Sequence, residues 1–454
     1  MATINGTNNS DFLNGTASPD LILGFGRRDF LLGNAGNDTL LGGGGRDALD
    51  GGTGNDNLEG QSGNDVLIGS AGNDFLNGGR NFDTADYSDL GEAITLEAVG
   101  IINKGSRGVD QILNVEAIIG AEGEDNAIDG STGTSSSTSF NIDLGNDSLV
   151  VRGIPGLGDI SFAIENFVDA IGTSQNDTIA GSSDDNLIQG GEGADEFLGS
   201  AGNDIIAGNR EDGIDDGSND TISYEGLGEA ITLTATGTVD KGTLGTDQLI
   251  RVETIEGDEG RDNVIDASDS FGATIDVNLA AQSLVVDINT DVLNTTLRRT
   301  VVNFVDVVGG SGTDRIADDS GNNELTGGGG RDTLEASAGN DTLSGGNGAD
   351  TIIADFGQDV LSGGNGADTF VLGENGQISF DDAGTSDFAS ITDFNSGVDK
   401  IQLTGFANLF SSVSFGANSQ LAVDTNNNGA FDNGDELIAR INGNFDFAND
   451  VIFD

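Results

Sequence analysis

The sequence predicts an all-β solenoid in which short parallel strands stack coil upon coil, and two observations predict it. An aspartate falls on every ninth residue from Asp11 to Asp83, and the first eight are followed by an aliphatic residue two positions later and a glycine four positions later. No segment of twelve or more residues places apolar residues at helical spacing. The expected unit is therefore a glycine-rich turn followed by a three-residue strand with one inward aliphatic side chain.

The first array of these nonapeptides occupies residues 1–83. From Gly36 onward, a second glycine stands two residues before each aspartate through Asp74, and the cleanest unit is GGTGNDNLE at 51–59. The first three units lack this glycine, as expected for the end of a solenoid. Because each turn reverses the chain, two consecutive units make one full coil.

A longer repeat follows the first array. DTADYSDLGEAITL at 83–96 recurs as DTISYEGLGEAITL at 220–233, and later residues of the two segments match at the same constant offset. We interpret residues 84–219 and 220–371 as two copies of one unit, made of short β-type runs between Gly, Ser and Thr turns. The first copy returns to the nine-residue period at 172–208 and the second at 312–371. The two copies are thus β-rich excursions that interrupt the solenoid.

Residues 372–454 differ in composition from the repeats. Eleven of the 23 phenylalanines lie between Phe370 and the end of the chain, so this segment can bury a small core of its own. We expect a C-terminal β-rich cap there. Its last residues, DFANDVIFD, mix acidic and apolar side chains in the manner of type I secretion signals, with a sheet-closing strand as the alternative.

Composition restricts the possible partners and activities. The formal charge is -60, from 17 basic and 77 acidic residues, and the chain has neither histidine nor cysteine. Such a chain repels nucleic acid and anionic membranes, and the partner it needs is a cation. Imidazole and thiolate catalysis are impossible, and no G-x-S-x-G motif occurs, so we do not expect an enzyme. No apolar stretch approaches the length of a membrane-spanning helix, so we expect no membrane insertion.

The spacing of the aspartates predicts calcium binding. Aspartates two units apart stack about 4.8 Å from each other, where two carboxylates repel by about 1 kcal/mol in water and more where water is excluded. Calcium takes six to eight oxygen ligands, which two carboxylates and the carbonyls of glycine turns can supply. The predicted aspartate ligands are Asp20, Asp29, Asp38, Asp47, Asp56, Asp65, Asp74, Asp177, Asp195, Asp204, Asp314, Asp332, Asp341, Asp350, Asp359 and Asp368. The predicted turn glycines are Gly36, Gly45, Gly54, Gly63, Gly193, Gly330, Gly348 and Gly366.

A further calcium loop is a candidate in the C-terminal segment. The run DTNNNGAFDNGD places acidic and amide side chains at the ligand positions of an EF-hand loop, namely Asp424, Asn426, Asn428, Asp432 and Asp435. An aspartate stands where a bidentate glutamate is usual, and no flanking helices are evident. A plain Asn-Gly turn between two strands is the alternative.

The unit Gly-Gly-x-Gly-x-Asp resembles the RTX, or haemolysin-type, calcium-binding nonapeptide, and six hexapeptides match it in full. The resemblance implies a parallel β-roll, folding that depends on calcium, and export by a type I secretion machinery without an N-terminal signal peptide. The duplicated unit and the run ITDFNSGVDKIQL at 391–403 are also similar to extracellular RTX proteins of cyanobacteria.

Two functions remain open at this stage. The first is an extracellular structural or surface protein that assembles with itself or with a matrix component, as in a sheath, an S-layer or a filament. The second is a soluble exoprotein or adhesin that binds a glycan or a cell surface through loops of the two excursions.

Overall fold

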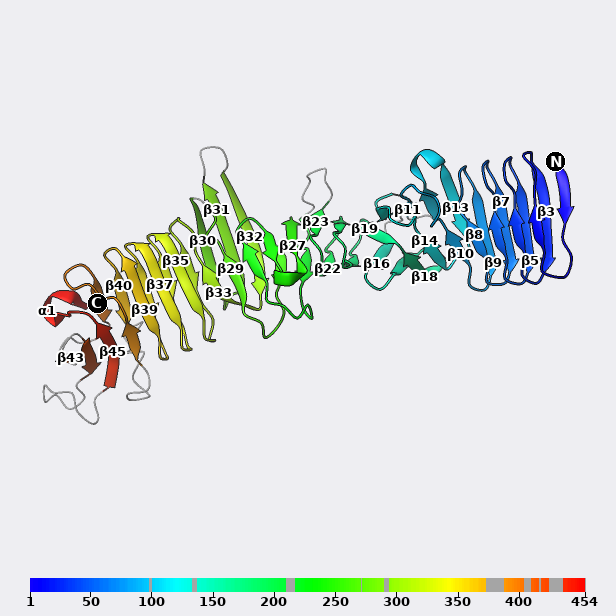
Figure 1. Cartoon of the computed structure of the whole chain (residues 1–454). Helices are drawn as coiled ribbons and strands as arrows, with labels where there is room; N and C mark the ends of the chain where they lie inside the picture. The colour runs from blue at the N-terminus through cyan, green and yellow to red at the C-terminus, as the bar shows by residue number, and fades with distance from the viewer. Residues whose placement is uncertain are drawn as a thin grey trace. The chain divides into compact units, whose positions relative to one another are not determined.

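The structure is a computed structural model that describes residues 1–97, 100–132, 137–209, 217–270, 272–289, 294–372, 388–403, 410–415, 418–423 and 436–453. The chain divides into two compact units, the first formed by Met1–Ser223 and Leu244–Val252, the second by Tyr224–Thr243 and Glu253–Asp454. Nearly all described elements are strands, which stack along each unit (Figure 1).

Unit 1 contains two facing rows of strands. Strands in the first row, in stacking order, are β1 (Ala2–Asn5), β3 (Asp20–Gly26), β5 (Thr39–Gly44), β7 (Asn57–Ser62), β9 (Phe75–Arg80), β13 (Val109–Leu113), β12 (Ile101–Asn103), β11 (Thr95–Glu97), β15 (Asn126–Asp129), β19 (Phe167–Ile171), β21 (Leu187–Gly191), β23 (Ile205–Asn209) and β27 (Thr246–Ile250). Strands in the second row are β2 (Phe12–Asn14), β4 (Phe30–Leu32), β6 (Ala48–Asp50), β8 (Val66–Ile68), β10 (Thr84–Asp86), β14 (Ala117–Ile119), β18 (Gly158–Glu165), β17 (Ser148–Ile154), β16 (Ser139–Asp143), β20 (Thr178–Ala180), β22 (Glu196–Leu198) and β24 (Thr221–Ser223).

Unit 2 repeats this plan. Its first row contains β26 (Thr238–Asp240), β25 (Thr232–Thr234), β29 (Asn263–Asp266), β33 (Phe304–Val308), β35 (Glu324–Gly330), β37 (Thr342–Gly348), β39 (Val360–Asn365), β41 (Ala389–Ile391), β45 (Glu436–Asn442), β44 (Asn418–Val423) and β43 (Phe410–Phe415). Its second row contains β28 (Thr254–Glu256), β32 (Asn294–Val302), β31 (Ser283–Asn289), β30 (Ala273–Asn278), β34 (Arg315–Ala317), β36 (Thr333–Glu335), β38 (Thr351–Ala354), β40 (Thr369–Leu372), β42 (Lys400–Leu403) and β46 (Val451–Phe453). Short helical turns are η1 (Gly105–Arg107), η2 (Gly242–Leu244) and α1 (Phe447–Asp450).

The coil of two nonapeptides is confirmed in the arrays. Strands β5 and β7 pair in parallel with Leu40 opposite Leu58, and β36 and β38 pair with Leu334 opposite Ile352. The aliphatic residue of each unit is almost completely buried, as at Leu49 and Leu67, which are 0% exposed. The core of an array is therefore two columns of aliphatic side chains, one from each row.

Strand length differs from the prediction on one side of the coil. The second row of the first array has the expected three-residue strands, but β5, β7 and β9 of the first row each have six residues. Their parallel pairing resumes beyond the inward glycine, where Gly43 lies opposite Gln61. Backbone pairing thus extends into what the sequence predicted to be turn.

The duplicated segments are β-rich, as predicted, and their strands join the same two rows. In unit 1, the antiparallel meander β11–β12–β13 lies in the first row, with β13 parallel to β9 and β11 parallel to β15. A second meander, β16–β17–β18, lies in the second row between β14 and β20. Each meander places three consecutive strands in one row, where a regular coil places one. The chain crosses to the other row only after the third strand.

The second copy uses the same device within unit 2, where β30–β31–β32 lies between β28 and β34. The C-terminal cap also extends both rows. Strand β41 stacks on β39, β42 stacks on β40, and the meander β43–β44–β45 follows. Phe370, Phe394 and Phe445 pack in sequence there, with ring centroids 6.2 and 5.7 Å apart.

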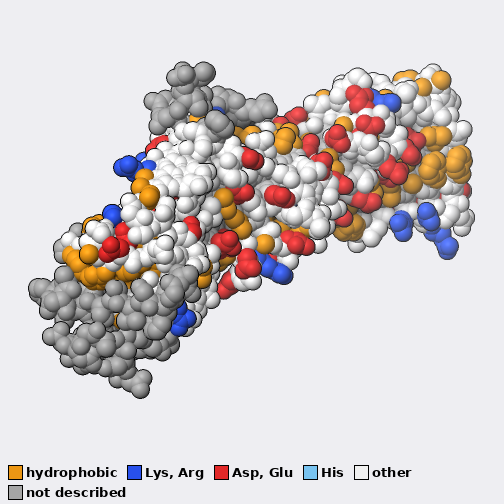
Figure 2. Space-filling model, turned by 60° about the vertical axis from the view of Figure 1, so that its left-hand side comes forward, with side chains coloured by type: hydrophobic (Ala, Val, Ile, Leu, Met, Phe, Trp, Pro, Cys, Tyr) orange, Lys and Arg blue, Asp and Glu red, His pale blue; other side chains and the backbone are white. Residues whose placement is uncertain are grey.

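The surface agrees with the composition. Acidic side chains are spread over the face drawn in Figure 2, whereas lysine and arginine are few. No helix in the described ranges is long and apolar enough to cross a membrane.

The glycine two residues before each aspartate gives a test of the fold. At Gly54 the φ angle is +135°, and an added Cβ would lie 1.6 Å from the carbonyl oxygen of Gly36 in the preceding coil. We expect Gly54→Ala to lower the free energy of unfolding in calcium by at least about 3 kcal/mol, because positive φ and steric overlap both oppose it. Gly123→Ala is the control, since Gly123 also has positive φ but open space, and should cost only about 1 kcal/mol. Equal effects in denaturant unfolding would contradict this assignment.

Candidate metal centres

The aspartates of the arrays form two hydrogen-bonded ladders. Along one edge of the first array, the N–H of Asp38 donates to Oδ1 of Asp56 at 2.7 Å, and the N–H of Asp56 donates to Oδ1 of Asp74 at 2.9 Å. Along the other edge, Asp47 donates in the same way to Asp65 at 2.8 Å. The third array repeats the pattern, as where Asp332 donates to Asp350 at 2.9 Å. One carboxylate oxygen of each aspartate therefore holds the register of neighbouring coils.

The second oxygen is buried and has no donor at most rungs. These Oδ2 atoms belong to Asp29, Asp38, Asp47, Asp56, Asp65, Asp83, Asp332, Asp341, Asp350 and Asp368. The side chains themselves are at most 3% exposed. A buried anionic oxygen without a hydrogen-bond donor strongly destabilises the fold. The negative charge of each row must therefore be neutralised by a bound cation or by protonation.

Glycines keep the space around these oxygens free of side chains. An added Cβ on Gly51 would lie 2.4 Å from Oδ2 of Asp56, and one on Gly345 would lie 2.6 Å from Oδ2 of Asp350. The predicted turn glycines all have φ between +110° and +154°, and they are Gly36, Gly45, Gly54, Gly63, Gly193, Gly330, Gly348 and Gly366. Carboxylate oxygens thus lie beside bare backbone in every coil.

This donor set fits calcium. It consists only of oxygens, the ligands that hard divalent cations prefer. The carboxylates lie in rows, and within the described ranges no three acidic side chains come together as a metal-binding cluster. Two aspartates would therefore supply part of a calcium shell, with backbone carbonyls and water supplying the rest. The bound ion would neutralise the unpartnered oxygens.

Several aspartates of these ladders have raised pKa values. Burial raises the pKa of Asp47, Asp56, Asp65, Asp332 and Asp368 to about 6, and the aspartates of adjoining coils add to the rise. Hydrogen bonds from the backbone oppose it. Without a metal ion, these groups therefore favour the protonated state far more than exposed aspartates do.

At the ends of the arrays, several predicted ligands have protein donors instead. Oδ2 of Asp20 accepts from the N–H and hydroxyl of Thr16, which hold its pKa below the usual value. Oδ2 of Asp177 likewise accepts from Thr173, and that of Asp314 accepts from the N–H of Gly310 at 2.9 Å. These rungs are satisfied without a cation.

The remaining predicted ligands fall into three groups. Oδ2 of Asp204 accepts from the Ser200 hydroxyl at 3.3 Å, and Oδ2 of Asp74 accepts from Lys104 at 3.1 Å. Asp195 and Asp359 are buried rungs whose Oδ1 atoms accept from Asp177 and Asp341. The loop ligands lie outside the described residues, and they are Asp424, Asn426, Asn428, Asp432 and Asp435.

Acidic residues that the nine-residue spacing did not reveal extend the ladders. Asp74 donates its N–H to Oδ1 of Asp110 at 2.9 Å, and Asp83 donates to Oε2 of Glu116 at 2.8 Å. Asp368 donates to Oδ1 of Asp399 at 3.1 Å. Asp195 and Asp204 likewise donate to Oδ1 of Asp220 and of Asp247, at 2.9 and 3.2 Å, so the added rungs include Asp110, Glu116, Asp220, Asp247 and Asp399. A glycine two residues earlier marks Asp110 and Asp399, and this short Gly-x-Asp signal could have identified both.

Asp318 is a buried carboxylate at a position where the regular unit has glycine. It stands five residues before Asn323, which itself replaces the repeat aspartate. Oδ1 of Asp318 accepts from the N–H of Ser337 at 2.8 Å, while Oδ2 of Asp318 and Oδ1 of Asn323 are buried without partners. Burial raises the pKa of Asp318 to about 7, and Asp341 contributes. In this coil the buried carboxylate therefore comes from the residue five positions before the usual aspartate position, which is occupied by Asn323.

In the duplicated segments, a neutral asparagine stands at the buried position and bonds the backbone of neighbouring coils. Oδ1 of Asn126 accepts from the N–H groups of Ile94 and Ala121, and its Nδ2 donates to the carbonyls of Ala121 and Asn166. Asn263 has the same arrangement in the second copy. Both amides are completely buried. A fully hydrogen-bonded amide needs no cation, so these coils close by protein contacts alone.

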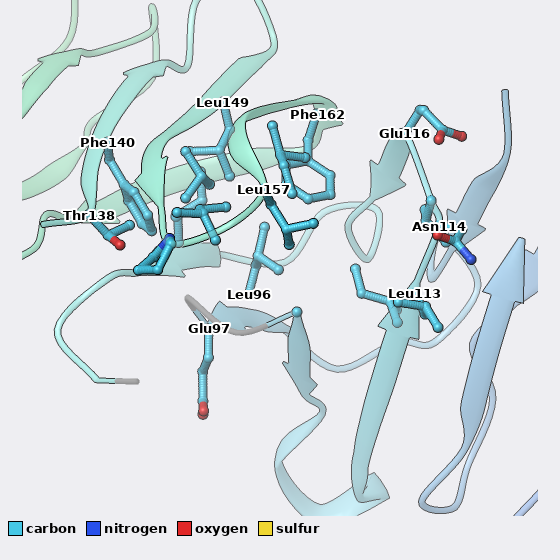
Figure 3. Close-up of a pocket in the computed structure, with 18 residues that line it drawn as sticks. Leu96, Glu97, Leu113, Asn114, Glu116, Thr138, Phe140, Leu149, Leu157 and Phe162 are labelled. Carbon is cyan, nitrogen blue, oxygen red and sulfur yellow. The ribbon is translucent and has the colours of Figure 1, made fainter. Parts of the chain in front are cut away.

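A second candidate site is a cavity of about 600 Å³ between the two meanders of the first copy. Its walls are mainly apolar, and Figure 3 draws Leu96, Leu157 and Phe162 around it, with the carboxylates of Glu97 and Glu116 pointing away from them. Position 162 corresponds to Arg299 in the second copy, where an added Cβ on Gly237 would lie 2.4 Å from the guanidinium. The two copies therefore differ in this region.

Comparison with known proteins gives the following matches. The family profile of the RTX calcium-binding nonapeptide repeat, which covers four copies of the repeat, matches residues 23–58, 50–85, 171–206, 308–343 and 344–375. These ranges cover the three arrays except for residues 1–22 and 207–208. Among solved structures, the extracellular lipase LipA from Serratia marcescens is similar, with 16% sequence identity and a TM-score of 0.17. The match covers 64% of this chain and 44% of the lipase chain. No curated protein matches the sequence.

The raised pKa values predict that protons partly replace the metal ion. An aspartate whose folded pKa lies near 6 and whose unfolded pKa lies near 4 binds more protons when folded, so it stabilises the fold at low pH and that contribution is lost as pH rises from about 4 to about 6. In EGTA, we expect the β-sheet circular dichroism signal to increase as pH falls from 7 to 5. In saturating calcium this increase should be absent. A calcium-free signal that falls or stays constant over this range would contradict the prediction.

Proposed function

This chain is an RTX-type calcium-binding repeat protein, and we propose that it works outside the cell as a structural or surface protein whose β-roll is completed by calcium. The supporting observation is the row of buried Oδ2 atoms without donors in the first and third arrays. Where calcium is submicromolar, as in a cytosol, these charges oppose folding; where it is millimolar, binding drives folding. Export by a type I machinery, which the family resemblance implies, suits a chain that folds only after it leaves the cell.

Self-assembly is the second part of the proposal. Phe12 of β2 stacks on Phe30 at 5.2 Å between ring centroids and is 67% exposed, and Phe25 is 51% exposed. Hydrophobic side chains gather on that part of unit 1 in Figure 2. Exposed aromatic rings favour association with another chain or a matrix component.

We propose further that the chain is not an enzyme. The sequence has no histidine or cysteine, and the buried carboxylates are arranged in stacked rows that suit a metal ion. Their role is to hold neighbouring coils together.

A calcium titration tests this proposal. In EGTA at pH 7 we expect little β-sheet signal, with folding on addition of calcium and polymers visible by negative-stain electron microscopy in millimolar calcium. Asp56→Asn should raise the calcium concentration for half-maximal folding about tenfold, the equivalent of about 1.4 kcal/mol. Asp89→Asn, at an exposed aspartate, is the matched control and should not change it. A full β signal in EGTA would refute the calcium switch, and monomers at all concentrations would refute self-assembly.

The cavity favours a second candidate function, binding of a surface amphiphile by the first excursion. Its apolar walls suit an alkyl chain, and the nearby Glu97 and Glu116 disfavour an anionic head group. The probe is therefore octyl glucoside below its micelle concentration, in calcium, measured by calorimetry. Phe162→Arg, which introduces the residue of the second copy, should abolish binding and leave calcium-induced folding unchanged. Equal binding by both proteins, or no binding by either, would refute this candidate.

A further inference from the structure

Lys104 is a lysine with no exposed surface, at the point where the first calcium array meets the duplicated segment. Its ammonium group donates to Oδ2 of Asp74 at 3.1 Å, to the carbonyl oxygen of Ser70 at 2.5 Å, and to Oδ1 of Asp110. All three partners are oxygens, and two are carboxylates. This is the kind of donor set that the arrays offer to calcium.

The surrounding geometry continues the aspartate ladder. Asp56 donates its N–H to Asp74, and Asp74 donates its N–H to Asp110, so Asp110 is the next rung although 36 residues separate the two. Gly108 also continues the glycine column, since an added Cβ on it would lie 2.1 Å from the carbonyl oxygen of Gly72. The position is therefore built like the preceding rungs.

One difference separates this rung from those before it. Oδ2 of Asp38 and of Asp56 are buried without a donor, whereas Oδ2 of Asp74 has the ammonium group as its partner. Oδ2 of Asp110 is also satisfied, by the hydroxyl of the fully buried Tyr87 at 3.1 Å. Every carboxylate oxygen at this rung has a protein donor, and the ammonium group offsets one of the two negative charges from within the chain.

The arrangement has a sequence signature that recurs once. Lys104 precedes GSRGVD, a hexapeptide that keeps the first and last glycine and the aspartate of the repeat. Lys241 precedes GTLGTD at the equivalent position of the second copy. Lys241 and Asp247 are both completely buried, as are Lys104 and Asp110 to within 1%. A buried ammonium requires close anionic partners, so the presence of both residues in both copies indicates a shared role.

We propose that Lys104 is a built-in cation that occupies a calcium position of the ladder, so that the row of calcium ions ends there and the first meander folds onto the array without metal. The inference rests on the proposed calcium function of the arrays. It assigns to Lys104 the same role in this rung that calcium has in the rungs before it. An ammonium group on a covalent tether is present at any calcium concentration, so this rung needs no calcium ion of its own.

Calcium stoichiometry tests the assignment. Lys104→Met removes the charge and keeps a side chain of similar length, so the Asp74–Asp110 pair should then require a metal ion. In saturating calcium, native mass spectrometry should count one more bound calcium per chain than in the wild type. Lys104→Met/Asp110→Asn should not gain this ion. Lys400→Met is the matched control, because Lys400 is partly exposed beside Asp450, and it should leave the count unchanged.

Hydrogen exchange gives an independent measurement. At the calcium concentration of half-maximal folding of the wild type, amides of β13 should exchange more slowly in the wild type than in Lys104→Met, and saturating calcium should remove this difference. An unchanged calcium count in folded Lys104→Met, failure of that variant to fold in saturating calcium, or equal exchange at the lower calcium concentration would each overturn the inference. If the wild type binds no calcium at all, the proposed function fails as well, and the two failures are thus distinguished.

Discussion

Nearly every unit of the nonapeptide arrays places an aspartate inside the molecule, where one oxygen accepts a backbone N–H and the other, in the middle of an array, meets no donor. The first contact holds the register, because Asp38 can only bond Asp56 when the coils are 18 residues apart. The second creates a row of buried like charges spaced by the coil rise. The aspartate side chain therefore specifies the register through one oxygen and destabilises the fold through the charge on the other. The rest of the structure depends on how that buried charge is compensated.

The buried carboxylate charge is compensated in four ways at different places in the chain. Unpartnered oxygens in the middle of the arrays suit calcium, while Asp20 and Asp177 at array ends accept from neighbouring threonines. Asn126 replaces the charge by a fully bonded amide, and Asp74 receives an ammonium group. Each of these protein partners lies outside the middle of an array. Dependence on calcium is thus a property of particular coils and varies along the chain.

The sequence predicted the arrays well, because their period equals half a coil and every aspartate therefore takes the same position in its unit. It also predicted the inward leucines, such as Leu49, and the glycine-rich turns, such as the one that contains Gly54. It could not predict that the duplicated segments continue both rows. There the pairing partner of Phe75 is Gln111, far along the chain, because Gln111 lies in the last strand of the three-stranded meander and that strand stacks on β9. Asp110 lies four periods of nine after Asp74, but the run of aspartates stops at Asp83 and Lys104 has no counterpart in the arrays, so the structure was needed to identify the two residues as a rung and its cation.

The same physical argument indicates where specific recognition belongs. In an array, the inward positions hold aliphatic residues, the turn positions hold glycines against backbone carbonyls, and the aspartates bind the ladder, so little of the unit is free to vary. A meander is held by antiparallel backbone pairing, and its side chains have no fixed role in metal binding. Phe162 and Arg299 occupy equivalent positions of the two copies, and Phe162 lines the apolar cavity of the first. The other meander that lines this cavity, β11–β12–β13, contains Lys104 and under the inference above joins the array without metal, so protein contacts alone set the shape of that wall.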